Sequence, residues 1–135
     1  MAGDNVELMR EAVAAWNRDD VAAVAGALDE FVVWDARDSP VPDLAGVYHG
    51  LAGVNDFWRR WLPMWEHLRV KIVWIEAIGD RVLMWVHQTQ VGRESGAETT
   101  VDYGWDVTFR EGAIIRVSFF TDEDGARKRA GLDVR

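Results

Sequence analysis

Two side chains of this sequence, Asp35 and His87, have the types and surroundings that acid–base chemistry needs. Asp35 ends the β-rich run 31–35 just before a loop with two prolines, and His87 lies midway along the aromatic-rich run 82–91. A carboxylate or imidazole shielded from water has an altered pKa and can exchange protons with a bound molecule. The two residues therefore suggest a base, Asp35, and an acid or orienting partner, His87.

A purely structural role is open for both residues. An aspartate before a proline-containing loop is a common turn former, and a histidine inside a strand can be a neutral core residue with both ring nitrogens bonded. The other two histidines, His49 and His67, lie on separate elements, and no ligand spacing joins the three. We therefore expect no metal site and no cofactor.

Three helices are predicted in the first half of the chain. Residues 4–17 have apolar side chains at helical spacing, ending at Trp16, and the alanine-rich residues 21–28 form a second, shorter helix after a capping aspartate. The third helix begins at Gly50. Its apolar face is the widest of the three and comprises Val54, Phe57, Trp58, Trp61 and Trp65.

The second half of the chain changes to a period of two. After the strand at 31–35, four consecutive antiparallel strands are expected at 68–78, 82–91, 99–109 and 114–120, separated by glycine-containing turns. Residues 122–132 form either a short closing helix or a loop. The predicted fold class is α+β: a cone-shaped, curved antiparallel sheet with three N-terminal helices packed on its concave face.

Composition limits the partners. The chain has 135 residues, enough for one domain spanning 1–135, a formal charge of −8, no cysteine and eight tryptophans. The negative charge disfavours nucleic acid, no apolar run is long enough for a membrane span, and the first residues lack a secretory signal. We expect a cytoplasmic protein that binds a small apolar ligand and, because both sheet faces are aromatic, forms a homodimer.

The order of these elements resembles the SnoaL-like branch of the nuclear transport factor 2-like superfamily. The resemblance implies a cone-shaped α+β barrel, usually dimeric, and the superfamily includes ketosteroid isomerase, SnoaL-type polyketide cyclases and limonene epoxide hydrolase. It covers nearly the whole chain. The motifs that carry it are Glu7 to Asn17 with Asp19 and Asp20, Trp34 and Asp35, Val47 to Gly50, Gly53 to Trp58, Phe109 to Gly112, and Ala130 to Leu132.

The likeness to ketosteroid isomerase implies that Asp35 matches the general base. The oxyanion-hole tyrosine and protonated aspartate of that enzyme fall on Ala12 and Trp105, so its isomerisation is not expected here. The Asp-Arg-Asp set of limonene epoxide hydrolase is also missing. SnoaL-type cyclases carry an acid–base aspartate on a late strand of the sheet, and Asp106 is the residue nearest to it in this sequence. The likeness to ketosteroid isomerase implies that Asp106 lies on the outer face. It also implies that Trp85, His87 and Thr89 face the pocket, although alternation alone does not choose between these residues and the set Val82, Met84, Val86 and Gln88.

Two functions remain open. The first is a cofactor-independent isomerase, cyclase or dehydratase in which Asp35 removes a proton next to a carbonyl, assisted by His87. The second is a non-catalytic ligand-binding or dimerisation module, and a pocket of a few hundred Å³ would distinguish a ligand site from a cone filled by its own side chains. The expected ligand-binding residues are Trp16, Phe57, Trp58, Trp61, Trp85, Thr89, Trp105, Val107, Val117 and Phe119.

Overall fold

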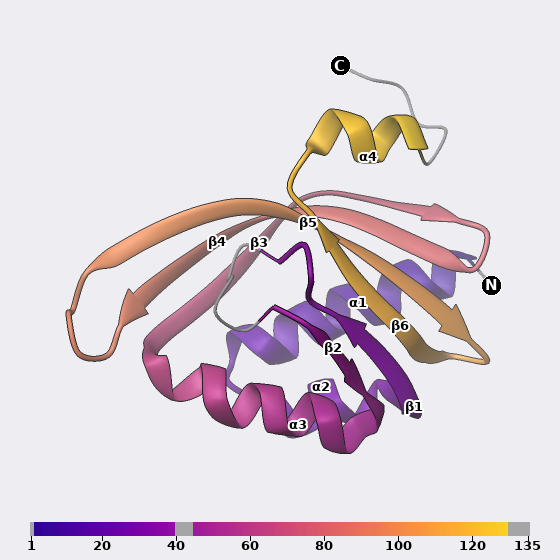
Figure 1. Ribbon diagram of the computed structural model, residues 1–135. Helices are drawn as coiled ribbons and strands as arrows, with labels where there is room; N and C mark the ends of the chain where they lie inside the picture. The colour runs from indigo at the N-terminus through magenta and orange to yellow at the C-terminus, as the bar shows by residue number, and fades with distance from the viewer. Residues whose placement is uncertain (1, 40–44, 130–135) are drawn as a thin grey trace.

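A computed structural model describes residues 2–39 and 45–129, and within them the chain folds around one curved six-stranded sheet (Figure 1). The strand order is β2-β1-β6-β5-β4-β3, with β1 parallel to β6 and the other neighbours antiparallel. The strands are β1 (Leu28–Asp35), β2 (Val47–His49), β3 (Trp65–Ile78), β4 (Arg81–Gly92), β5 (Glu98–Arg110) and β6 (Ala113–Phe120). The predicted α+β class is confirmed.

The helices divide between the two sides of the sheet (Figure 1). On the concave side lie α1 (Ala2–Asn17), α2 (Val21–Gly26) and α3 (Gly50–Trp61), as predicted, whereas α4 (Glu123–Arg129) lies on the opposite side. The Asp20 carboxylate accepts a hydrogen bond from the backbone N–H of Ala23 and so caps α2, as the sequence indicated. Residues 130–132 of the predicted tail lie outside the described residues. No described helix is long and apolar enough to cross a membrane.

The third helix is shorter than its apolar pattern suggested. It ends at Trp61, a 3₁₀ turn follows over Leu62–Met64, and Trp65 already belongs to β3. Pro63 explains the difference, because proline lacks the N–H that a helix interior needs and its ring clashes with the preceding turn. The short strand β2, which pairs Tyr48 with Trp34 of β1, was also missed. A three-residue strand is too short to show a period of two.

The core lies between the sheet and α1–α3, and aromatic rings fill its centre. The indole of Trp34 is 4% exposed. It packs against four other rings, with centroids 5.6 to 5.9 Å away: Phe57, Trp58, Trp105 and Phe119. Three of these four pairs are edge-to-face, the arrangement that the ring quadrupole favours. This cluster joins α3 to β1, β5 and β6.

The end of α1 is fastened to the free edge of β3 by one side chain. The Asn17 amide donates to the carbonyl of Val70 and accepts from the N–H of the same residue, both at 2.8 Å. This pair of bonds imitates the contact that a neighbouring strand would make. It fixes where α1 crosses the sheet.

The convex face has its own small apolar cluster, which consists of Leu83, Trp85 and Phe120 with Trp74 and Ile78 packed around them. Helix α4 is anchored beside it through Trp74: the indole N–H donates to Glu123, and the guanidinium of Arg127 lies 4.0 Å from the ring centroid. Gly104 makes room for this cluster, since a Cβ at that position would overlap the ring of Phe120.

Candidate functional site

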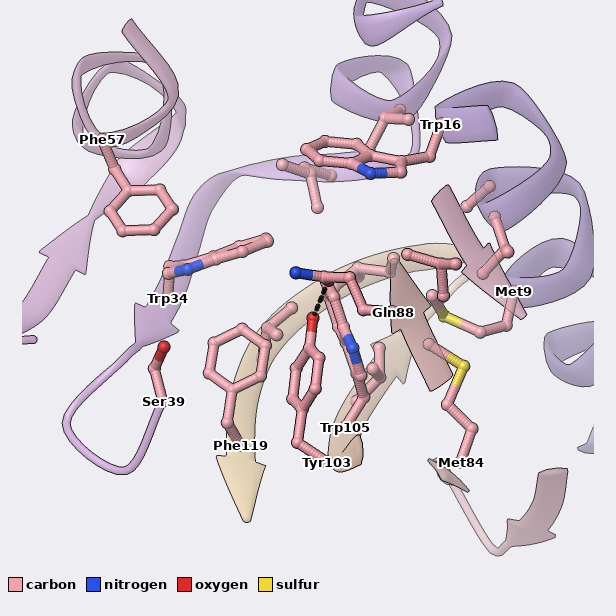
Figure 2. Close-up of a pocket in the computed structure, with 18 of the residues that line it drawn as sticks. Met9, Trp16, Trp34, Ser39, Phe57, Met84, Gln88, Tyr103, Trp105 and Phe119 are labelled. Atoms are coloured by element: carbon pink, nitrogen blue, oxygen red, sulfur yellow. Dashed lines mark hydrogen bonds between the residues drawn. The ribbon is translucent and has the colours of Figure 1, made fainter. Parts of the chain in front are cut away.

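An apolar cavity lies inside the described part of the cone, between α1, α3 and the concave face of the sheet (Figure 2). Its volume is about 60 Å³, well below the few hundred Å³ expected for a ligand site. Aromatic side chains occupy most of the space that the fold encloses. The lining comprises Met9, Ala12, Val13, Trp16, Val24, Leu28, Trp34, Ser39, Phe57, Trp61, Val70, Met84, Gln88, Tyr103, Trp105, Val107, Ile114, Val117 and Phe119.

Polar groups are few in this lining. Besides Ser39, they are Gln88 and Tyr103, together with the indole nitrogens. The Tyr103 hydroxyl donates to the Gln88 side-chain oxygen at 2.7 Å, and the Gln88 nitrogen donates to the side-chain oxygen of Gln90 at 2.8 Å. Burial raises the pKa of Tyr103 above its usual value, so the phenol stays neutral. The described lining contains no carboxylate and no imidazole.

Most of the predicted ligand-binding residues do line the cavity. They are Trp16, Phe57, Trp61, Trp105, Val107, Val117 and Phe119. Trp58 lies behind this layer, 2% exposed, and packs against Trp16 and Trp34. Its ring supports the lining and is not part of it.

The predicted orientation of β4 is wrong. Trp85, His87 and Thr89 point to the convex face, and Met84 and Gln88 line the cavity in their place. Trp85 packs in the outer cluster, and Thr89 pairs across the sheet with Thr100. The error arose because both faces of this strand are covered by apolar side chains, so the alternation marks no solvent side. Asp106, expected on the outer face, does lie there and pairs with Arg81.

His87 and Asp35 do not meet. His87 lies in an open groove with Lys71 and Trp85, and its Nδ1 is 2.6 Å from a carboxylate oxygen of Asp102 on β5. Asp35 lies in a different cleft, of about 640 Å³, on the convex side. Asp35 and His87, predicted as base and orienting partner, are therefore not in contact, and His87 interacts with Asp102 instead.

Asp35 is the centre of an ion-pair cluster. Its side chain is 9% exposed, Arg37 binds both of its oxygens at 2.9 and 2.7 Å, and Arg116 donates to it at 2.9 Å. The hydrogen bonds from Arg37 are the main reason why the pKa of Asp35 is lowered to about 2. A carboxylate with so low a pKa is a weak base. Ser39 and Phe119 line both this cleft and the cavity, so they separate the two.

This pKa gives Asp35 a measurable role in stability. The pKa in the folded protein lies below its ordinary value of 3.8, so ionised Asp35 stabilises the fold above about pH 4, and this contribution disappears as the pH falls through 2. We expect Asp35→Asn to lower the free energy of unfolding by about 1–2 kcal/mol at pH 7, a range reduced for solvent screening of the two exposed arginines. At pH 2 the variant and the parent should differ little.

Urea unfolding at pH 7, 4 and 2 measures this difference. Asp56→Asn is the matched control, because Asp56 forms only exposed ion pairs on α3 and its loss should cost less than about 0.5 kcal/mol. A pH-independent cost at Asp35 would contradict the assignment of its stabilising effect to the charged carboxylate.

The curved α+β fold with an apolar cavity inside it is the fold class predicted from the sequence. The comparison with protein families identifies the family. Residues 9–117 match the SnoaL-like domain family, so this chain belongs to it. No curated protein matches the chain.

Several solved structures share the fold. A nuclear transport factor 2-like protein of unknown function from Burkholderia pseudomallei is 22% identical, with a TM-score of 0.78 over 92% of this chain and 95% of that one. TerC co-crystallised with polyporic acid is 20% identical, with a TM-score of 0.77 over 94% and 98%. A putative SnoaL-like polyketide cyclase from Jannaschia sp. is 15% identical, with a TM-score of 0.76 over 98% and 94%. At these identities the likeness concerns the fold.

Proposed function

We propose that this SnoaL-like protein binds a small, largely apolar ring compound in the cavity and does so without acid–base catalysis. The observation that carries the proposal is the composition of the described lining: aromatic and aliphatic side chains with one amide, one neutral phenol and the hydroxyl of Ser39, and no group that titrates near neutral pH. Apolar cavities of this kind stay dry and take up small apolar molecules. Family membership supports a ligand-binding or cyclase-type protein.

The size of the cavity limits the ligand. An apolar cavity of about 150 Å³ accommodates benzene, and the present 60 Å³ does not reach that. A ring compound must therefore displace one of the side chains that fill the cone. Trp105 is the best candidate, because its indole is only partly buried and it borders the existing space.

A matched pair of variants tests this. Trp105→Leu should increase the affinity for indane about tenfold, because the ligand no longer has to displace an indole. Trp85→Leu removes the same ring from the neighbouring strand on the convex face and should leave the affinity unchanged. Chemical-shift titration of the ¹⁵N-labelled protein measures both constants and shows which residues contact the ligand.

The proposal is wrong if indane shows no saturable binding to either the parent or Trp105→Leu, or if the two substitutions have equal effects on its affinity. Shifts concentrated at Trp74 and Trp85 would likewise place the ligand on the convex face and outside the cavity.

The second candidate function is the acid–base enzyme with Asp35 as base. The observation in its favour is that Ser39 and Phe119 border both the cavity and the Asp35 cleft, so the two spaces share a wall. Against it stand the two arginines and the low pKa. The discriminating measurement is the exchange of the α-protons of indan-1-one with D₂O: catalysis by the parent protein that Asp35→Asn abolishes would establish this candidate.

The homodimer and the cytoplasmic location stay predictions. Sedimentation of the purified chain tests for the dimer.

A further inference from the structure

The amide of Gln88 is a buried polar group inside an apolar cavity. Its side chain is 1% exposed. Its oxygen accepts the Tyr103 hydroxyl, and its nitrogen uses one N–H for Gln90. An amide nitrogen has two N–H groups, and within the described residues the second finds no acceptor. Figure 2 shows this nitrogen directed into the cavity, toward Trp34.

Other donors in the lining are also unpaired. The indole N–H groups of Trp34 and Trp61 are buried and have no hydrogen-bond acceptor in the part of the chain that the structure describes. A buried donor without an acceptor is costly, because it has lost its hydrogen bond to water. The cavity therefore has more donors than acceptors, and a ligand that brings an acceptor corrects the imbalance.

The absence of charged side chains from the described lining restricts the charge of the ligand. A cationic ligand would need a carboxylate, and an anionic ligand would need a basic group, to offset the cost of leaving water. The described lining contains neither. A neutral acceptor remains, and a carbonyl oxygen is the one that a flat ring compound carries most compactly.

We propose that Gln88 is a specificity-determining residue that donates a hydrogen bond to the carbonyl oxygen of a neutral cyclic ketone or quinone bound in the cavity. The inference rests on the proposed ligand-binding function and deepens it. Tyr103 is a positioning residue, because its hydroxyl holds the amide oxygen and thereby directs the nitrogen toward the ligand. The ligand's rings contact the aromatic lining, and its oxygen meets the amide.

The experiment compares indan-1-one with indane, which share the ring skeleton and differ in the carbonyl. Dissociation constants are measured for the parent protein, Gln88→Met, which keeps a similar volume without the amide, and Tyr103→Phe, which keeps the ring without the hydroxyl. Using the ratio of the two constants within each protein cancels the different hydration of the two ligands. Gln88→Met should change this ratio about tenfold in favour of indane, and Tyr103→Phe should change it in the same direction by a smaller factor.

Infrared spectroscopy supplies a second readout, which reports directly on the carbonyl group of the bound ligand. The carbonyl stretch of bound indan-1-one should shift to lower frequency in the parent protein, as expected for a hydrogen-bonded carbonyl, and the shift should be lost in Gln88→Met. If both ligands bind the parent but the ratio and the stretch are insensitive to Gln88, the inference is wrong while the ligand-binding function stands. If neither ligand binds, the proposed function fails and this inference with it.

Discussion

Replacing Trp34 with alanine should lower the free energy of unfolding by about 3–5 kcal/mol, the largest effect we expect for a single substitution in this protein. The indole is 4% exposed and contacts four rings from α3, β5 and β6. Its removal eliminates these ring contacts and leaves a cavity that the surrounding side chains fill only in part. Urea unfolding followed by far-UV circular dichroism measures the loss.

Trp74→Ala is the matched control. Trp74 is half-buried on the convex face, where it packs beside the small convex cluster and contacts Glu123 and Arg127 of α4. We expect this substitution to cost about 2 kcal/mol, the scale of one cation–π contact and one hydrogen bond. If the two substitutions cost the same, the cluster around Trp34 is not the main stabilising core. Should Trp34→Ala fail to fold, Trp34→Phe provides a milder test of the same position.

Gly104→Ala is the substitution with the second largest expected effect on the free energy of unfolding, and its cause is overpacking. The Cβ of an alanine would occupy the place of the Phe120 ring, which packs on Trp85 with a centroid distance of 5.9 Å. The ring must move, and we expect a loss of about 2–3 kcal/mol. The backbone of Gly104 itself is not strained, since its φ angle lies outside the left-handed region.

A double-mutant cycle isolates this steric cause. In a Phe120→Ala background the obstructing ring is gone, so adding Gly104→Ala should cost nothing or stabilise the protein slightly through the lower entropy of the unfolded chain. Gly104→Ala in the parent and in the Phe120→Ala background would then differ by about 2–3 kcal/mol. A cost that is equal in both backgrounds would contradict the clash with Phe120 as its cause.

The fold could be predicted from the sequence because its long elements have clear periods and glycine turns. The helix whose apolar stripe ends at Trp16 and the hairpins around Gly79 and Gly112 lie where the pattern predicted them. The differences from the prediction have two causes. In one case a single residue interrupts the apolar pattern, and in the other the element is too short to show a pattern. Pro63 ends α3 within an apolar stripe that continues past it, and β2 has only three residues.

The candidate site was predicted only in part, and the reason lies in the pairing of β4 with β5. The sequence interpretation placed both Trp85 and Trp105 in the pocket. In the structure Trp105 pairs with Met84, and Trp85 pairs with Gly104. Directly paired residues share a face of a sheet, so Trp85 and Trp105 lie on opposite faces. Knowing which residues of β4 and β5 pair would have placed Gln88 on the inner face. Alternation within β4 alone does not say which of its two faces is the inner one.

Asp35 shows a different limit. Its place at the end of a strand was predicted, but its function as a base depended on what surrounds it. Arg37 is two residues away, and Arg116 comes from β6, which lies beside β1 only through a parallel pairing. No local pattern in the sequence indicates that second arginine.

The bond between Asn17 and Val70 has a consequence for how the chain avoids aggregation. β3 is an outermost strand, and an exposed row of backbone N–H and C=O groups invites another chain to add itself as a further strand. At Val70 the side chain of Asn17 already occupies both groups. The opposite edge is β2, which is only three residues long. A strand added by another chain would therefore lose its pairing at Val70 on one edge of the sheet and would find only three residues to pair with on the other.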